Sequence, residues 1–327
     1  MTPGGFFLSR ARWERGGRGR SRSLYLFLFL LLFLPAVPFL GSYVLFVMTL
    51  AFLFATLAMS WTLLARAGQI SLGHAAFFGL GAYGSALLVL RAEVNPFLAV
   101  GFGAGLSTLF AWLVGKLCFR FGGIYFALAT FAANELVKAS TMNLTSLTHG
   151  TQGLVGIPAF PSWRVGSIEV DFLHAQWPNY YVGWLLLVAV VWTTRWLMTA
   201  RVGLAFAAIR ESEQAAASLG VDLGLYKGRA LLLSAFFTGL GGAFYAHLIH
   251  FLNPNAVFSV SFSAMPLVMS LFGGLTTISG PLIGALTLYL VDAFVFQPLF
   301  PFSHQMLYGV VLIGVLLFMP RGLTGRR

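Results

Sequence analysis

The histidines and acidic residues of this sequence are the side chains that could bind a metal or act on a substrate, but their spacing supports neither activity. His247 and His250 are three residues apart and could share one face of a helix, yet they lie at a predicted membrane boundary and are better interpreted as an interfacial pair. No segment matches H-E-x-x-H, a nucleophile elbow or G-x-x-x-x-G-K-[ST], the loop that binds a nucleotide's phosphates. We therefore predict a protein that is not an enzyme, with no metal site and no cofactor bound by this chain.

A second group of polar side chains lies inside apolar segments, where it could line a path for a solute. The candidates are Gln69, Ser71, His74, Thr130 and Glu135. For His74, a packed and hydrogen-bonded histidine is the stronger alternative. For Glu135, a carboxylate near a helix end, paired with Lys138 three residues later, is an equal alternative. Asp292 is the other acidic residue within an apolar segment, and an interfacial position explains it somewhat better than a buried one.

Glycines interrupt two of these apolar segments. At membrane depth, glycine either allows close helix packing or breaks a helix beside a water-filled path. A proline in the first turn of a helix is also tolerated, because its missing N–H would have no helical partner there. The residues predicted to break or pack helices are Gly68, Gly73, Gly273, Gly274, Gly280 and Pro281.

The segment 201–220 differs from the apolar segments around it. Residues 205–219 are strong helix formers, Gly220 is a natural helix stop, and Arg210 could pair with Glu213 at i+3. The segment has too many alanines for an ordinary solvated face and too many charges to span a membrane. Such a helix suits a groove on another protein, and an amphipathic helix on the lipid surface is an equally good alternative.

The composition of the chain indicates which kind of structural element holds these residues. Of 327 residues, 58% are hydrophobic and 9% are charged, whereas soluble domains carry roughly a quarter charged residues. Six of the twenty basic residues lie in one arm, 1–22, directly before an apolar run. This arrangement predicts contact with membrane lipid rather than nucleic acid, with a cleaved signal peptide as the weaker alternative. The single cysteine, Cys118, cannot form a disulfide within the chain.

We predict an all-α, polytopic membrane protein with about ten transmembrane helices and broken or glycine-rich spans. The spans lie near 24–40, 43–64, 69–90, 96–117, 121–139, 180–198, 229–250, 259–276, 280–297 and 304–320. The domains are a basic cytoplasmic arm (1–22), a transmembrane domain (23–323) and a cytoplasmic tail (324–327). Two long connections, 140–179 and 199–228, fall on opposite sides. With both termini cytoplasmic, only Arg91, Lys138 and Arg164 of the twenty basic residues lie outside, which is the positive-inside pattern.

Several motifs resemble one transporter family. Residues 213–220, Glu-Gln-Ala-Ala-Ala-Ser-Leu-Gly, resemble the EAA loop of ABC-importer permeases. The segments 68–83, 123–132, 148–158 and 273–285 are similar to LivM-type permeases of the branched-chain amino acid ABC transporters. Together the motifs cover residues 60–323 in the family's order, and this ordered set is specific. The sequence departs from the family at Thr276, where a glycine is usual.

The resemblance implies a permease subunit of an importer for leucine, isoleucine and valine in the bacterial cytoplasmic (inner) membrane. Its implied partners are a second, LivH-like permease, two ATP-binding subunits that hold ATP and Mg, and an external amino-acid-binding protein. The residues implied to couple this chain to the ATPases are Arg210, Glu211, Glu213, Ala216 and Gly220. Permeases for urea or short amides resemble the family too. A proton-coupled secondary transporter that uses Glu135 or Asp292 remains the less favoured alternative, and it would work alone in liposomes.

Overall fold

The computed structural model describes residues 26, 28–36, 41–119, 123–165, 168–299, 309–310, 314 and 322–324. The predicted basic arm and nearly all of the predicted tenth span lie outside the described residues, as do residues 325–327 of the predicted tail. The described chain is mostly helical, as predicted. Seven of its helical stretches are long and apolar enough to cross a membrane: Ser42–Arg66 (α2), His74–Ala92 (α3), Pro96–Cys118 (α4), Trp177–Thr199 (α7), Leu223–Ile249 (α10), Pro254–Gly273 and Ser279–Leu299.

The last two of these stretches consist of several elements. The first contains α11 (Pro254–Val257) and α12 (Val260–Gly273), and the second contains α13 (Ser279–Val291), a π-helical turn η3 (Asp292–Phe296) and α14 (Gln297–Leu299). The predicted fifth span corresponds to α5 (Ile124–Asn143), a helix that carries Glu135 and Lys138 and is not among the seven. Ten spans were predicted, and seven stretches of the described residues are long and apolar enough to cross a membrane.

The remaining elements are short and lie in the connections. They are η1 (Leu34–Ala36), α6 (Thr145–Thr148), η2 (Gly150–Gln152), α8 (Arg201–Glu211), α9 (Glu213–Ser218), β1 (Leu154–Val155), β2 (Trp163–Val165), β3 (Ile168–Val170) and β4 (Phe251–Leu252). Strands β1 and β4 pair antiparallel, with Leu154 opposite Leu252, and β2 and β3 form a small hairpin. The sequence did not predict these two ladders, whose strands are only two or three residues long.

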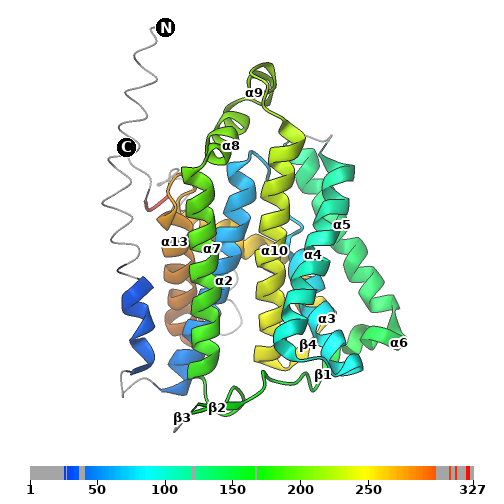
Figure 1. Ribbon diagram of the computed structural model, residues 1–327, viewed down its shortest axis with the longest axis vertical. Coiled ribbons are helices and arrows are strands. Elements are labelled where there is room, and N and C mark those ends of the chain that lie inside the picture. The colour runs from blue at the N-terminus through cyan, green and yellow to red at the C-terminus, as the bar shows by residue number, and fades with distance from the viewer. Residues whose placement is uncertain are drawn as a thin grey trace.

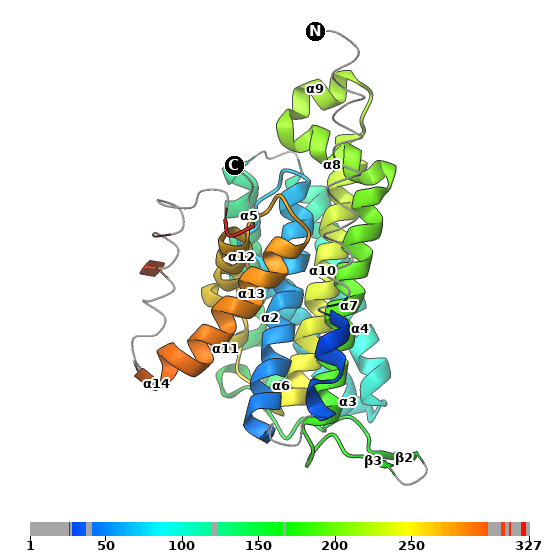
Figure 2. The ribbon, with the colours of Figure 1, turned by 90° about the vertical axis from the view of Figure 1, so that its left-hand side faces the viewer.

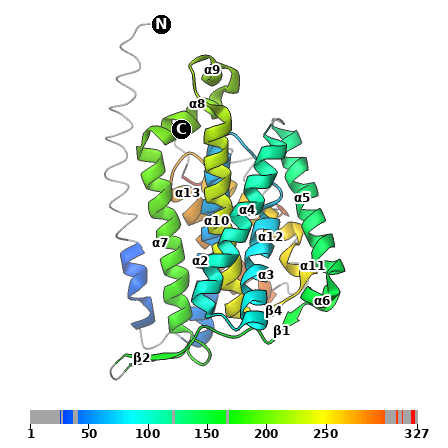
Figure 3. The ribbon, with the colours of Figure 1, turned by 45° about the vertical axis from the view of Figure 1, so that its right-hand side comes forward.

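Helix α2 lies in the middle of the bundle and packs against α7, α10, α12 and α13 (Figures 1 and 2). A helix satisfies its own backbone polar groups, so an apolar helix can be buried in this way without cost to its hydrogen bonds. Helix α10 also packs closely on α3 and α4. Small residues allow this contact, because a Cβ on Gly81 would overlap the carbonyl oxygen of Gly239. Helix α5 lies at the edge of the bundle beside α4 (Figure 3).

The two long connections lie at opposite ends of the bundle (Figure 1). One end carries α8 and α9, and the other carries α6, the β1–β4 ladder and the β2–β3 hairpin. Basic residues gather at the α8–α9 end, where α2, α4 and α7 finish and α10 begins: Arg66, Lys116, Arg195, Arg201, Arg210, Lys227 and Arg229. Arg91 and Arg164 lie at the opposite end. The separation of the long connections and of the basic residues follows the pattern that the sequence predicted.

Candidate functional site

The chain between α2 and α3 is not helical, and we call residues 67–73 the unwound segment. It opens at Gly68, whose φ is +78°, a conformation that favours glycine. Polar groups of the segment are bonded by side chains: Trp61 Nε1 donates to the carbonyl oxygen of Ser71 at 2.9 Å, and the Leu72 N–H donates to Thr130 Oγ1 at 3.2 Å. The predicted third span therefore becomes a helix only from His74. An unwound backbone is tolerated at membrane depth when protein groups replace the lost helical bonds.

Four of the five predicted pathway residues gather around this segment, but they are packed. Gln69, Ser71, His74 and Thr130 are all buried. His74 Nε2 bonds Ser234 Oγ on α10 at 2.8 Å, which fits the packed-histidine alternative. Ser71 accepts the N–H of Gly73 at 3.1 Å. In this conformation these side chains therefore hold the unwound segment against α5 and α10.

Glu135, the fifth pathway candidate, is half-buried and lies on α5 beyond Thr130. Its carboxylate accepts a hydrogen bond from Asn134 Nδ2 at 3.2 Å. Asn134 is fully buried and also donates to the carbonyl oxygen of Phe258 at 3.0 Å, joining α5 to the end of α11. Sequence reasoning missed Asn134. The signal was its position four residues after Thr130, which places both polar groups on one face of a helix.

The segment 201–220 forms two helices rather than the single helix predicted over 205–219. Ser212 lies between α8 and α9 in an extended conformation, with φ −162° and ψ 115°, and its side chain caps α9 by accepting the N–H of Ala215 at 3.2 Å. A serine side chain makes this capping bond when the serine precedes the first residue of a helix. Ser212 therefore begins a new helix and interrupts the preceding one. Gly220 ends the second helix with φ +80°, as a helix stop should.

The two short helices have different surroundings. Phe206 of α8 is buried in a cluster with Leu64 and Phe77, so α8 is packed onto the bundle. Helix α9 projects beyond the ends of the long helices (Figure 2). Leu219, directly after α9, is 81% exposed, and Ala217 is exposed beside it, whereas Ala216 is buried. Leu219 is therefore an exposed apolar side chain at the projecting end of the described bundle.

The predicted pair between Arg210 and Glu213 is wrong, because the break at Ser212 separates the two side chains. Arg210 instead lies near Glu211, with Nη2 3.7 Å from Oε1. Glu213 Oε2 forms a salt bridge of 2.7 Å with Lys227 Nζ of α10, and Glu213 Oε1 accepts a long hydrogen bond of 3.4 Å from Gln69 Nε2. Sequence reasoning missed Lys227. Its only signal is a basic residue, followed by Arg229, at the start of a long and mostly apolar helix.

The predicted glycine corner around 273–281 turns α12 into α13 at the same end of the bundle. Gly274 has φ +102°, and a Cβ on Gly273 would overlap the carbonyl oxygen of Gly280. Pro281 lies in the first turn of α13. Arg66, at the end of α2, donates to the carbonyl oxygen of Thr277 at 2.8 Å and so joins this corner to the start of the unwound segment.

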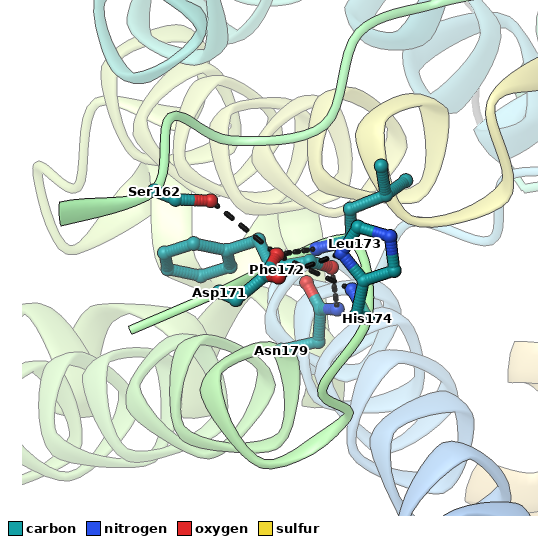
Figure 4. Close-up of polar contacts among 6 residues, drawn as sticks. All are labelled: Ser162, Asp171, Phe172, Leu173, His174 and Asn179. Carbon is teal, nitrogen blue, oxygen red and sulfur yellow. Dashed lines mark hydrogen bonds and ion pairs between the residues drawn. The ribbon is translucent and has the colours of Figure 1, made fainter. Parts of the chain in front are cut away.

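The opposite end is organised by side chains that bond loop backbone (Figure 4). Asp171 accepts the N–H groups of Leu173 and His174 at 2.9 and 3.2 Å and bonds His174 Nδ1 at 2.7 Å. His247 and His250 bond the carbonyl oxygens of Pro158 and Ile157, which ties the loop to α10. Over the described residues, no three His, Cys, Asp or Glu side chains gather as a metal site would require.

Comparisons with known proteins identify the family of this chain. The family described as "Branched-chain amino acid transport system / permease component" matches residues 43–318. LivM, the high-affinity branched-chain amino acid transport system permease protein, is 29% identical over 306 residues in Salmonella typhimurium, which is 86% of this chain and 70% of that protein. LivM of Escherichia coli is 28% identical over 279 residues, 78% of this chain and 64% of that protein. The autoinducer 2 import system permease protein LsrC of Yersinia enterocolitica is 28% identical over 247 residues, 72% of this chain and 66% of that protein.

The match with the family covers most of the chain, including the unwound segment, α8–α9 and the glycine corner. A permease component is in keeping with the seven described helices that are long and apolar enough to cross a membrane. The chain therefore belongs to the family of branched-chain amino acid transport system permease components.

Proposed function

We propose that this chain is the transmembrane permease subunit of an ABC importer that moves branched-chain amino acids across the bacterial inner membrane. The observation that carries the proposal is α9, which projects from the bundle with Leu219 exposed and is joined to the buried unwound segment through Glu213. A membrane domain that only anchored or stabilised a complex would need no such contact between a surface helix and its interior. The chain's family membership supports the same function.

In this proposal, α9 and the residues around it dock on ATP-binding subunits at the cytoplasmic side. The coupling residues are Arg210, Glu211, Glu213, Ala216 and Gly220, and ATP and Mg are held by the partner subunits. The other partners are a second, LivH-like permease and an external amino-acid-binding protein. ATP can drive transport only by favouring one arrangement of the complex over the other, and α9 is the element of this chain placed to transmit that preference.

The proposed solute path runs past the unwound segment and α5. A branched-chain amino acid has a zwitterionic end and an apolar end, and a mostly apolar path with a few polar groups suits both. Because Ser71, His74 and Thr130 are buried in this conformation, the path opens only when the unwound segment moves. A second candidate cargo is an autoinducer-2-like solute, favoured by the similarity to LsrC. Urea and short amides remain cargo alternatives.

The docking test uses Leu219→Asp in the assembled complex. A charge on this exposed leucine adds no strain to the chain itself but must be desolvated in an apolar groove. We expect loss of co-purifying ATPase and of ATP-driven uptake by about tenfold or more, the loss expected for removing roughly 1.4 kcal/mol at an interface. Ala216→Trp and Glu213→Arg are poorer tests, because Ala216 is buried and Glu213 pairs with Lys227 inside the chain.

Leu173→Asp is the matched control, since Leu173 is 56% exposed at the opposite end of the bundle. We expect this variant to retain ATPase association. The docking proposal is wrong if the Leu219 variant keeps both the ATPase and the uptake of the unmodified complex. The wider importer proposal is wrong if the purified chain moves solute in liposomes without any ATPase.

A further inference from the structure

We propose that Lys227 and Gln69 are positioning residues that fasten α9 to the unwound segment, so that a displacement of α9 displaces that segment. Together with Glu213 they form what we call the carboxylate latch (Gln69, Glu213 and Lys227). The inference rests on the proposed function, because it assumes that a partner moves α9. It adds two residues and a route by which that movement reaches the interior.

The first step is the buried cation. The side chain of Lys227 is 3% exposed and that of its partner Glu213 is 38% exposed, with 2.7 Å between Nζ and Oε2. Removing the carboxylate would leave a buried and unpaired ammonium group, which is strongly unfavourable. Helix α9 therefore cannot shift away from α10 unless the ion pair moves as a unit or Lys227 finds another partner. The pair ties the surface helix to the first turns of α10.

The second step is the amide of Gln69. Its Nε2 donates to the other oxygen of the same carboxylate at 3.4 Å, and its Oε1 is buried without a partner among the described residues. Among the described residues, Glu213 is thus the one side chain that holds the Gln69 amide. The bond is long, so it depends on Lys227 to hold the carboxylate in place. The unwound segment is therefore attached to α9 through Glu213, and both Gln69 and Lys227 are needed for the attachment.

The third step is the route inward from Gln69. The same segment lies against α8 at Gly68, where a Cβ would be 3.4 Å from the Cα of Arg210. Four residues further on, Leu72 donates to Thr130 of α5, and His74 bonds Ser234 of α10. The unwound segment lacks a helical hydrogen-bond ladder between two long helices, so it is the part of the chain best able to absorb a shift. A push on α9 reaches Thr130 and His74 through it.

The test follows the unwound segment directly. Ile70 lies in this segment and is half exposed, so Ile70→Cys in a Cys118→Ala background can be labelled with a polar maleimide. The complex with its ATPases is compared with and without a non-hydrolysable ATP analogue. We expect the analogue to change the labelling rate by about fivefold or more, the lower end of usual coupling between sites.

Three variants are then made in the same background. Lys227→Met removes the charge and keeps the apolar stem, and Gln69→Leu removes the amide at similar size. Each is expected to reduce the response to the ATP analogue by a similar, measurable factor while ATP hydrolysis persists, and the double variant is expected to lose no more than either alone. Lys116→Met is the matched control, because Lys116 lies at the same end but stacks on Trp112 of its own helix. Its response should be unchanged.

The outcomes separate the two levels of the proposal. If the reference complex hydrolyses ATP but the labelling of Ile70 does not respond, the latch is wrong and the importer function stands. A normal response in either single variant, or losses that multiply in the double variant, also overturns the latch. If no ATPase binds the reference chain, the proposed function itself fails. Should Lys227→Met fail to assemble, Gln69→Leu decides alone, because Gln69 is buried and its own side chain presents no surface to a partner.

Discussion

At the scale of single residues, Asp171 shows how one side chain orders a loop outside the membrane-spanning helices. The pKa of Asp171 is lowered from 3.8 to about 2. The main cause is the hydrogen bond from the N–H of Leu173, and the next is the hydrogen bond with the side chain of His174. The ionised form is therefore the one that the folded loop favours. A group with a depressed pKa contributes stability above its unfolded pKa and loses it as the pH falls toward the folded value.

The pH dependence gives a first prediction. Between pH 4 and pH 2 the loop around 171–174 should become increasingly open to pepsin, because Asp171 is protonated and its bonds to Leu173 and His174 weaken. Asp171→Asn cannot titrate, so the ratio of cleavage in the unmodified chain to cleavage in this variant should rise as the pH falls. Dividing the two rates cancels the pH dependence of pepsin itself. A ratio that stays constant across this range would show that the carboxylate does not hold the loop.

At the scale of elements, the unwound segment depends on a close approach between backbones. A Cβ on Gly73 would overlap the carbonyl oxygen of Thr130, and a backbone atom cannot move aside as a flexible side chain can. The same contact places the Leu72 N–H on Thr130 Oγ1. The position of α5 against α3 is therefore set at this glycine.

Gly73→Ala should lower the stability of the purified chain by about 1–3 kcal/mol, as overpacking of a filled core does. The measurement is the temperature midpoint of unfolding in detergent. Gly105→Ala is the control, since Gly105 is exposed on α4 with no atom within 4 Å of an added Cβ. That variant should be neutral or gain up to about 1 kcal/mol from alanine's better helix propensity. Equal midpoints for the two variants would exclude the close contact.

At the scale of the whole molecule, the bundle has two chemically different ends. The end with α8 and α9 carries most of the described basic residues, and the end with the β2–β3 hairpin carries Arg91 and Arg164. Lys and Arg are enriched on the cytoplasmic side of membrane proteins. The proposed function also requires the α8–α9 end to face the cytoplasm, because ATP is available to partner subunits on that side.

Thiol labelling in intact cells tests this orientation. In a Cys118→Ala background, Leu173→Cys should react with a membrane-impermeant maleimide added from outside, and Leu219→Cys should react only after permeabilisation. Both leucines are exposed in the isolated chain, and the labelled cells lack the proposed ATPase subunits, so a missing reaction reports the side of the membrane rather than burial. Labelling of the Leu219 variant from outside would reverse the orientation and remove the docking proposal with it.

The sequence alone was sufficient for the class of protein, for most of its apolar helices and for the turns at Gly68 and Gly274. These features are local, because a span needs only about twenty apolar residues in a row and a glycine acts on its own backbone. The motifs are short local patterns too, and their order along the chain indicated the family. The family comparison agrees with that assignment. The break at Ser212 was also within reach, since a serine before Glu-Gln-Ala is a typical helix start.

Only the tertiary structure decided which charges meet and which polar groups are buried. Gln69 and Glu213 are 144 residues apart in the sequence, yet they share a hydrogen bond. The salt-bridge partner of Glu213 is Lys227 rather than the predicted Arg210. Helical periodicity assigns side chains to a face, but it does not say which helix covers that face. Ser71 and Thr130 therefore look alike in sequence whether they line a path or pack inside the bundle, and their neighbours in the fold determine which they do.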